Sequence, residues 1–301
     1  MSPAGPILSH VLPVERIVAA SPSVYAGQFR CAPDHPLFPG GRPCSSFCVV
    51  FPREVAWIQH DDGPRFVADM QVATLYNQGQ VYRRWSIGRR PDRCDWLAFP
   101  AGIVRDAVRT CSPADADHPS GPFRFGFAPI TADVYASQRR LFEGLERGLV
   151  TDAADVEDRA MALLDAVVRH GYAARGEAAA RSVASPRMRD AIEHVRHLLA
   201  RRPQDRRTLA DLAATVDLSP FHLCRAFRRV TGRTITSYRT NLRVRASLER
   251  MADGEDLTSI ALSLGFVSHS HFTHAFGSVF GVSPSAMRRP PHGAGSPPAL
   301  E

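Results

Sequence analysis

The sequence has no lysine, no long apolar run and no cysteine pair of the C-x2-C type that is common at zinc sites. All 37 residues counted as lysine or arginine are therefore arginines. No stretch approaches the roughly 18 consecutive apolar residues of a membrane-spanning helix. Residues 1–13 lack the charged start and the apolar core of a secretory signal. These absences predict a cytoplasmic protein that stays out of membranes, with its six cysteines as reduced thiols.

The excess of positive over negative charge lies in the C-terminal part of the chain. Residues 183–301 hold 17 arginines and 10 acidic residues, whereas residues 1–182 hold 20 of each. The net charge of +7 therefore belongs to one part alone. This asymmetry indicates a nucleic-acid-binding part joined to a neutral one. The 301 residues, 44% of them hydrophobic, are enough for two domains with separate cores.

Residues 208–232 have the pattern of two short helices joined by a turn. Ser219 suits the N-cap of the second helix, Pro220 its first position and Gly232 its C-terminal stop. Helical spacing marks the buried side of this helix: Leu223, Ala226, Phe227 and Val230. The outward side is left to Phe221, Cys224, Arg225, Arg228 and Arg229. A basic, partly aromatic helix face fits the major groove of DNA, although the solvated face of a helical hairpin has the same pattern.

The same pattern occurs again 49 residues later. Residues 268–281 match residues 219–232 position for position in their buried set, which is here Phe272, Ala275, Phe276 and Val279. The helix before them is repeated as well. Between the two units, residues 236–251 contain no glycine or proline and predict one helix of about 24 Å. Such a helix can hold two reading helices in successive turns of the groove, roughly 34 Å apart.

At these residues the sequence resembles the AraC/XylS family of bacterial transcription regulators. The resemblance covers residues 187–288 and rests on the pattern Ala261-x3-Gly265-Phe266-x-Ser268-x3-Phe272-x3-Phe276-x4-Gly281-x-Ser283-Pro284. It implies a seven-helix DNA-binding domain with two helix-turn-helix units, preceded by a cupin-like sensor domain. It also implies double-stranded promoter DNA, a small-molecule effector and RNA polymerase as partners. The base-reading positions that it implies are Phe221, Cys224 and Arg225, and then His269, Ser270, Thr273 and His274.

Two residues depart from this family pattern. Gly277 stands where a basic residue is common, and Met287 stands where tyrosine commonly follows Ser-Pro. The second reading helix also contains no arginine. We therefore expect it to hold phosphate more weakly than the first.

The N-terminal part contains short runs with strand character, separated by many turn residues. The runs are 46–51, 55–60, 70–76, 80–87 and 96–99, with a possible strand over 23–30. They predict an antiparallel barrel or jelly roll. Helices are predicted over 102–110, 131–147 and 152–172, the last two either packed on the barrel or forming a homodimer contact.

The predicted fold class is thus α+β, with a cupin-like antiparallel β-barrel and two helices before an all-α domain. The predicted divisions are a sensor and dimerisation domain over 1–172, a linker over 173–185, a DNA-binding domain over 186–289 and a disordered tail over 290–301. Seven residues on the predicted strands are candidates for an effector pocket: Trp57, His60, Tyr76, Tyr82, Arg84, Trp85 and Trp96. Most aromatic residues of a barrel belong to its core, so the alternative for each of the seven is a core position without contact to a ligand.

Cysteine and histidine residues near the N-terminus raise the alternative of a metal site or a thiol sensor. The candidate ligands are Cys31, His35, Cys44 and Cys48, with His60, Cys94 and Cys111 as possible additions. Their spacings are C-x3-H and C-x3-C, which differ from the pairs typical of zinc. The sequence therefore favours ordinary cysteines, and we predict no cofactor.

These features favour a sequence-specific DNA-binding transcription regulator that is controlled by a small molecule and is not an enzyme. One rival is an enzyme, either a cupin-type metal oxygenase or a DNA alkyl-transfer protein with a reactive cysteine. The oxygenase needs clustered ligands, and the strands offer only His60. For the alkyl-transfer protein, Arg30 beside Cys31 and Arg93 beside Cys94 are neighbours that favour a thiolate. A second rival is an adaptor that binds a protein partner.

Overall fold

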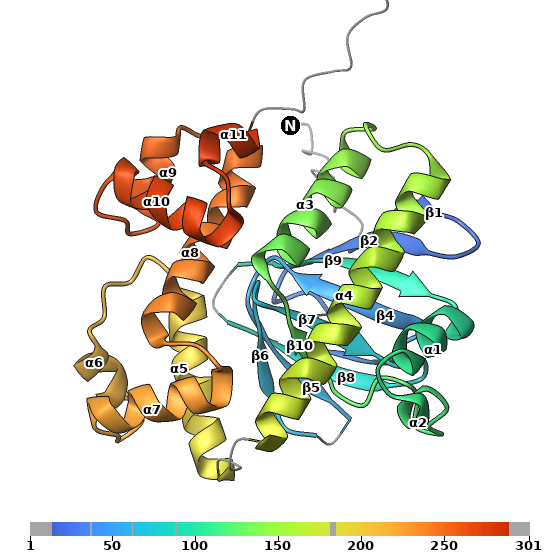
Figure 1. Cartoon of the computed structure of the whole chain (residues 1–301), viewed down its shortest axis with the longest axis horizontal. Coiled ribbons are helices and arrows are strands. Elements are labelled where there is room, and N and C mark those ends of the chain that lie inside the picture. The colour runs from blue at the N-terminus through green and yellow to red at the C-terminus, as the bar shows by residue number, and fades with distance from the viewer. Residues whose placement is uncertain (1–13, 37, 62, 88–89, 181–184, 289–301) are drawn as a thin grey trace, which may run out of the picture.

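The computed structural model describes residues 14–36, 38–61, 63–87, 90–180 and 185–288. The predicted tail over 290–301 lies outside the described residues. The N-terminal part contains two antiparallel sheets, with helices against one of them, and the C-terminal part is helical (Figure 1). The predicted α+β class is confirmed. Among the described helices, none combines the length and the apolarity needed to cross a membrane.

The larger sheet has the strand order β1-β2-β9-β4-β7-β10. Its strands are β1 (Glu15–Ala20), β2 (Tyr25–Cys31), β9 (Asp92–Phe99), β4 (Phe47–Pro52), β7 (Val72–Tyr76) and β10 (Phe127–Pro129). The smaller sheet has the order β3-β8-β5-β6. Its strands are β3 (Gly40–Pro43), β8 (Val81–Ser86), β5 (Ala56–His60) and β6 (Phe66–Ala68). The two sheets remain separate, so the predicted barrel is not closed.

The alternation of side chains along the strands gives the larger sheet two different faces. On β9, Leu97 and Phe99 belong to the core that the helices cover, whereas Cys94, Trp96 and Ala98 line a cavity on the other face. The covering helices are α1 (Ala101–Arg109), α2 (Pro113–Ala116), α3 (Ala132–Glu146) and α4 (Ala153–Ala180). The cavity therefore lies against the face of the sheet that these helices leave free.

The apolar stripes of α3 and α4 are buried within the chain itself. Val134 and Leu141 of α3 and Ala160, Leu164 and Val167 of α4 are all at most 8% exposed. They belong to one core with the larger sheet, so these stripes pack within the chain itself, and the homodimer contact expected of the two helices stays a prediction. The predicted linker over 173–185 also needs correction, because α4 continues to Ala180 and the next helix begins at Pro186.

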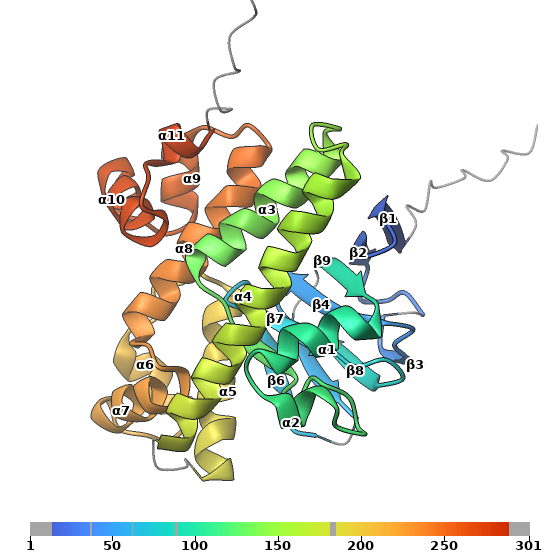
Figure 2. The same cartoon turned by 45° about the vertical axis from the view of Figure 1, so that its right-hand side comes forward.

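Seven helices follow among the described residues, the number that the family resemblance implies. They are α5 (Pro186–Arg201), α6 (Leu209–Ala214), α7 (Pro220–Thr231), α8 (Ile235–Ala252), α9 (Leu257–Ser263), α10 (His269–Phe280) and α11 (Pro284–Arg288). The pairs α6–α7 and α9–α10 are the two predicted units, and α8 is the long helix between them. In Figures 1 and 2, α7 lies toward one end of α8 and α10 toward the other end. The β-sheets lie on the other side of α8 from these two helices.

The helices α7 and α10 begin and end in the same way because their capping residues are the same. Each has 12 residues. The side chains of Ser219 and Ser268 accept hydrogen bonds from backbone N–H groups at 3.2 and 3.1 Å. Gly232 and Gly281 end the helices with φ values of 74° and 71°, which glycine adopts without steric cost.

The turns inside the two units differ in the residue that takes a positive φ. Asp217 has φ 53° in the first turn and Gly265 has φ 83° in the second. A Cβ atom on Gly265 would lie 2.7 Å from the backbone oxygen of Gln204. This position therefore needs glycine for its close approach as well as for its dihedral angle.

The first half of the helical domain docks on an open sheet edge. β6 is the last strand of the smaller sheet. The N–H of Val67 donates to Glu193 of α5 at 2.9 Å, and Arg196 of α5 donates to the Val67 carbonyl at 3.0 Å. These side chains satisfy backbone groups that an edge strand otherwise exposes.

The long helix α8 is fixed to the N-terminal part by buried charged groups. Arg245, which is fully buried, donates to the carbonyls of Met70 and Ile130, the latter at 2.9 Å. Glu249 accepts from Arg53 at 3.0 Å and pairs with Arg139 at 2.8 Å. The helix that separates α7 from α10 is thus held directly by the N-terminal part.

Candidate nucleic-acid interface and ligand cavity

The outer face of α7 presents the five residues that the sequence places there. Phe221 is 64% exposed, and Cys224, Arg225, Arg228 and Arg229 are also exposed. The guanidinium group of Arg225 lies 5.6 Å from the centre of the Phe221 ring. None of the three arginines forms an ion pair with any residue that the structure describes. Their charges are therefore free to meet phosphate or base edges.

The outer face of α10 is polar but lacks permanent charge. His269, Ser270 and His274 are exposed, whereas Thr273 is half-buried. The Thr273 hydroxyl is buried and has no hydrogen-bond partner within the described ranges. Thr273 is therefore the candidate least suited to contact DNA. His271 packs its ring 5.4 Å from that of Phe266 and donates its backbone N–H to the N-cap serine.

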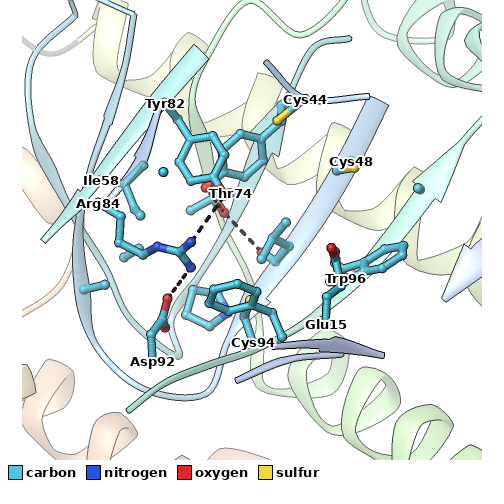
Figure 3. Close-up of a pocket in the computed structure, with 18 of the residues that line it drawn as sticks. Glu15, Cys44, Cys48, Ile58, Thr74, Tyr82, Arg84, Asp92, Cys94 and Trp96 are labelled. Atoms are coloured by element: carbon cyan, nitrogen blue, oxygen red, sulfur yellow. Dashed lines mark hydrogen bonds and ion pairs between the residues drawn. The ribbon is translucent and has the colours of Figure 1, made fainter. Parts of the chain in front are cut away.

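A cavity of about 640 Å³ lies between the two sheets. Four of the predicted pocket residues line it, namely Tyr76, Tyr82, Arg84 and Trp96. Figure 3 shows Arg84 and Asp92 on one side of this space, and Glu15 and Trp96 on the other. Glu15, Asp92 and Cys94 also line this space, although they were not among the predicted pocket residues. The alternation along β9 could have identified Cys94, because it lies two residues from Trp96.

Three of the predicted pocket residues do not line this cavity. Trp57 packs its ring 5.5 Å from that of His197 on α5, and Trp85 lies under the guanidinium group of Arg65 at 3.9 Å. His60 is buried between Phe66 and Tyr76, with ring-centre distances of 5.5 and 4.6 Å. Trp57 and Trp85 are cross-strand partners. They therefore occupy the face of the smaller sheet opposite to Arg84.

The burial of His60 has a consequence for stability at acid pH. Burial lowers the pKa of His60 to about 4, because neither ring nitrogen has a hydrogen-bond partner among the described residues. A histidine in the unfolded chain has a pKa near 6.5, so the unfolded state takes up the proton first as the pH falls. The free energy of unfolding therefore falls by roughly 2–3 kcal/mol between pH 7 and pH 4.5.

The variant His60→Phe should remove this part of the pH dependence. Urea unfolding at pH 7 and pH 4.5 measures it, and His269→Phe, a substitution of an exposed histidine on α10, is the control that should leave it unchanged. An acid loss of the same size in wild type and His60→Phe contradicts the assignment.

The N-terminal cysteines are arranged neither as a metal site nor as reactive thiols. In the ranges that the structure describes, no three His, Cys, Asp or Glu side chains are grouped to hold a metal ion, so the hypothesis of a site at Cys31, His35, Cys44 and Cys48 is not supported. Burial raises the pKa of Cys44 to about 11 and of Cys48 to about 12.

The two cysteines that follow an arginine in the sequence behave in the same way. Burial raises the pKa of Cys31 and raises that of Cys94 further. Adjacent residues on a strand point to opposite faces, so Arg30 and Arg93 do not supply the expected activation. This argues against an alkyl-acceptor cysteine, which needs an accessible thiolate.

The chain matches a known family over residues 212–290, described as a helix-turn-helix domain. The uncharacterized HTH-type transcriptional regulator YidL of Escherichia coli K12 is 36% identical over 85 residues, which are 28% of this chain and 29% of YidL. The bifunctional transcriptional activator/DNA repair enzyme Ada of the same organism is 35% identical over 81 residues, which are 27% of this chain and 23% of Ada.

The matched region thus spans less than a third of the length of either relative. Among solved structures, ToxT from Vibrio cholerae O395 superposes over 88% of this chain and 97% of ToxT, with a TM-score of 0.34 and 13% identity. A superposition this loose carries no conclusion about ligands.

Proposed function

We propose that this chain, whose residues 212–290 are a helix-turn-helix domain of the AraC type, is a sequence-specific transcription regulator controlled by a small molecule. The observation that carries the proposal is the duplicated unit itself. Two helices of equal length and equal capping lie toward the two ends of one long helix, and the first presents three arginines that form no ion pair with the described residues. Such a pair of helices suits two successive major-groove contacts on one duplex.

The residues of the two units have different roles in this proposal. Arg225, near the start of α7, contacts a base edge, together with Phe221 and Cys224. Arg228 and Arg229, in the last turn of the helix, contact phosphates and position it. In the second unit, His269, Ser270 and His274 contact bases. The sequence of α10 contains no arginine that could bind the DNA phosphates. The first unit should therefore contribute most of the salt-dependent affinity.

The N-terminal part supports regulation because one strand connects the cavity to the long helix α8. On β9, Trp96 faces the cavity, and its neighbour Asp95 pairs with Arg139 at 3.0 Å. Arg139 in turn pairs with Glu249 of α8. A ligand that moves β9 acts through these contacts on the helix that sets the spacing of α7 and α10. In this proposal the effector works from the cavity, RNA polymerase is the partner at the promoter, and a homodimer forms through surfaces other than the buried stripes of α3 and α4.

A gel-shift assay with the DNA upstream of the protein's own gene tests the function. At physiological salt we expect a shifted complex that survives a large excess of unrelated DNA, because specific sites are typically bound 10³-fold or more tighter than others. Equal competition by specific and unrelated DNA, for this region and for genomic fragments selected with the full-length protein, contradicts sequence-specific regulation.

A further inference from the structure

The cavity between the sheets has aromatic walls and few charged groups. Tyr25, Phe29, Tyr76, Tyr82 and Trp96 contribute their rings to it. Its volume of about 640 Å³ is in the range of sites that enclose a small organic ligand. The apolar walls therefore favour a ligand with an aromatic or aliphatic body, and the few charged groups decide which polar end it carries.

Among the described residues that line the cavity, Arg84 is the one cation, and it already has three hydrogen-bond partners in the protein. Arg84, which is 6% exposed, donates from Nη1 to Asp92 at 2.6 Å, from Nε to the Phe38 carbonyl at 2.9 Å and from Nη2 to the Tyr82 hydroxyl at 3.4 Å. Its guanidinium carbon also lies 4.1 Å from the centre of the Phe29 ring. A ligand carboxylate would have to share Arg84 with Asp92, whose charge already neutralises it.

The carboxylates of the cavity outnumber its cation. Asp92 is paired with Arg84, and Glu54 is paired with Arg90 at 3.4 Å. Glu15 has neither an ion pair nor a hydrogen bond from its side chain to any other described residue. Glu15 is an exposed residue of β1, where partial desolvation raises the pKa of its carboxyl and the charge of Arg84 lowers it by a smaller amount. Figure 3 places Glu15 beside Trp96 at one side of the space.

We propose that this cavity selects a ligand with a protonated amine on an aromatic or aliphatic body, and that it discriminates against a carboxylate of the same shape. The amine binds Glu15 and the face of an adjacent aromatic ring, where a cation is attracted by the ring's quadrupole. A carboxylate meets Glu15 as a like charge, and the one cation it could reach, Arg84, is already neutralised by Asp92. This inference rests on the proposed function only in taking the cavity as the effector site.

Three probes of one skeleton test the inference, namely 4-phenylbutylamine, 4-phenylbutan-1-ol and 4-phenylbutanoate. Isothermal titration of each into the full-length protein at pH 7.5 should give the tightest binding for the amine, at least tenfold tighter than for the alcohol, with the acid weakest. Glu15→Gln should bring the amine to the affinity of the alcohol and change the alcohol by less than twofold. Asp158→Asn, on the exposed side of α4, should change none of them.

The inference is overturned if the acid binds as tightly as the amine, or if the amine shows no binding at millimolar concentration. A gel shift on the same protein sample separates this result from failure of the proposed function. A protein that binds its DNA but does not prefer the amine refutes the ligand class alone. A protein that prefers the amine but binds no DNA specifically keeps the ligand class and refutes the regulator.

Discussion

Replacing Asp95 with alanine should lower the free energy of unfolding by about 3–5 kcal/mol. The side chain is completely buried on β9 and accepts from Arg139 at 3.0 Å, from Arg53 at 3.5 Å and from Gln28 at 2.9 Å. Without it, two buried guanidinium groups share Glu249, and Arg53 keeps in addition a longer contact with Glu146 at 3.7 Å. Removing one partner of a buried ionic group is costly because the remaining charges stay desolvated.

Urea unfolding followed by circular dichroism measures this loss. The matched control is Asp106→Ala, which removes an aspartate that pairs with Arg109 at 2.6 Å while 77% exposed. An exposed pair of this kind contributes less than about 1 kcal/mol. If the two variants lose similar stability, the network around Asp95 is not a structural centre of the protein.

Arg225→Ala should weaken binding to the specific site by about 1–3 kcal/mol, which is roughly 5- to 150-fold, and should relax the preference at one base position. Arg225 is exposed on the reading face of α7 and its guanidinium group is free of carboxylate partners among the described residues. Arg228→Ala should instead weaken binding to all sequences by a similar factor. It should also reduce the slope of log affinity against log salt by about 1.

Binding titrations against the selected site and against its single-base variants, at several salt concentrations, distinguish these two effects. Arg140→Ala makes the same change on the exposed side of α3 and should alter neither specificity nor salt dependence. If Arg225→Ala and Arg228→Ala both bind as wild type does, the reading face has been assigned to the wrong side of α7.

The tandem units could be predicted from the sequence because their signals are local. Ser219 and Gly232 start and stop α7 through bonds within a few residues, and Ser268 and Gly281 do the same for α10. Because the same pattern recurs 49 residues later, each unit supported the prediction of the other. For the same reason three of the four predicted residues on each helix are buried, while Val230 and Val279 are partly buried.

The cavity could be predicted only in part because it depends on how separate strands pair. Arg84 and Trp85 are adjacent on β8 and must point to opposite faces, so both could not line one pocket. The pairing of Trp57 with Trp85 shows which face of the smaller sheet is turned away from the cavity. This pairing between two strands has no signature in the local sequence. The charged contacts between Glu249 and both Arg53 and Arg139 join residues far apart in the chain and were likewise invisible in the sequence.

Guanine-methylation interference on a selected DNA site shows whether α7 and α10 contact one duplex together. We expect interfering guanines in two major-groove patches on one face of the DNA, about 10 base pairs apart. Arg225→Ala should relieve the interference in one patch only, and His274→Ala in the other only. A single patch, or two patches that both respond to Arg225→Ala and neither to His274→Ala, would contradict the claim.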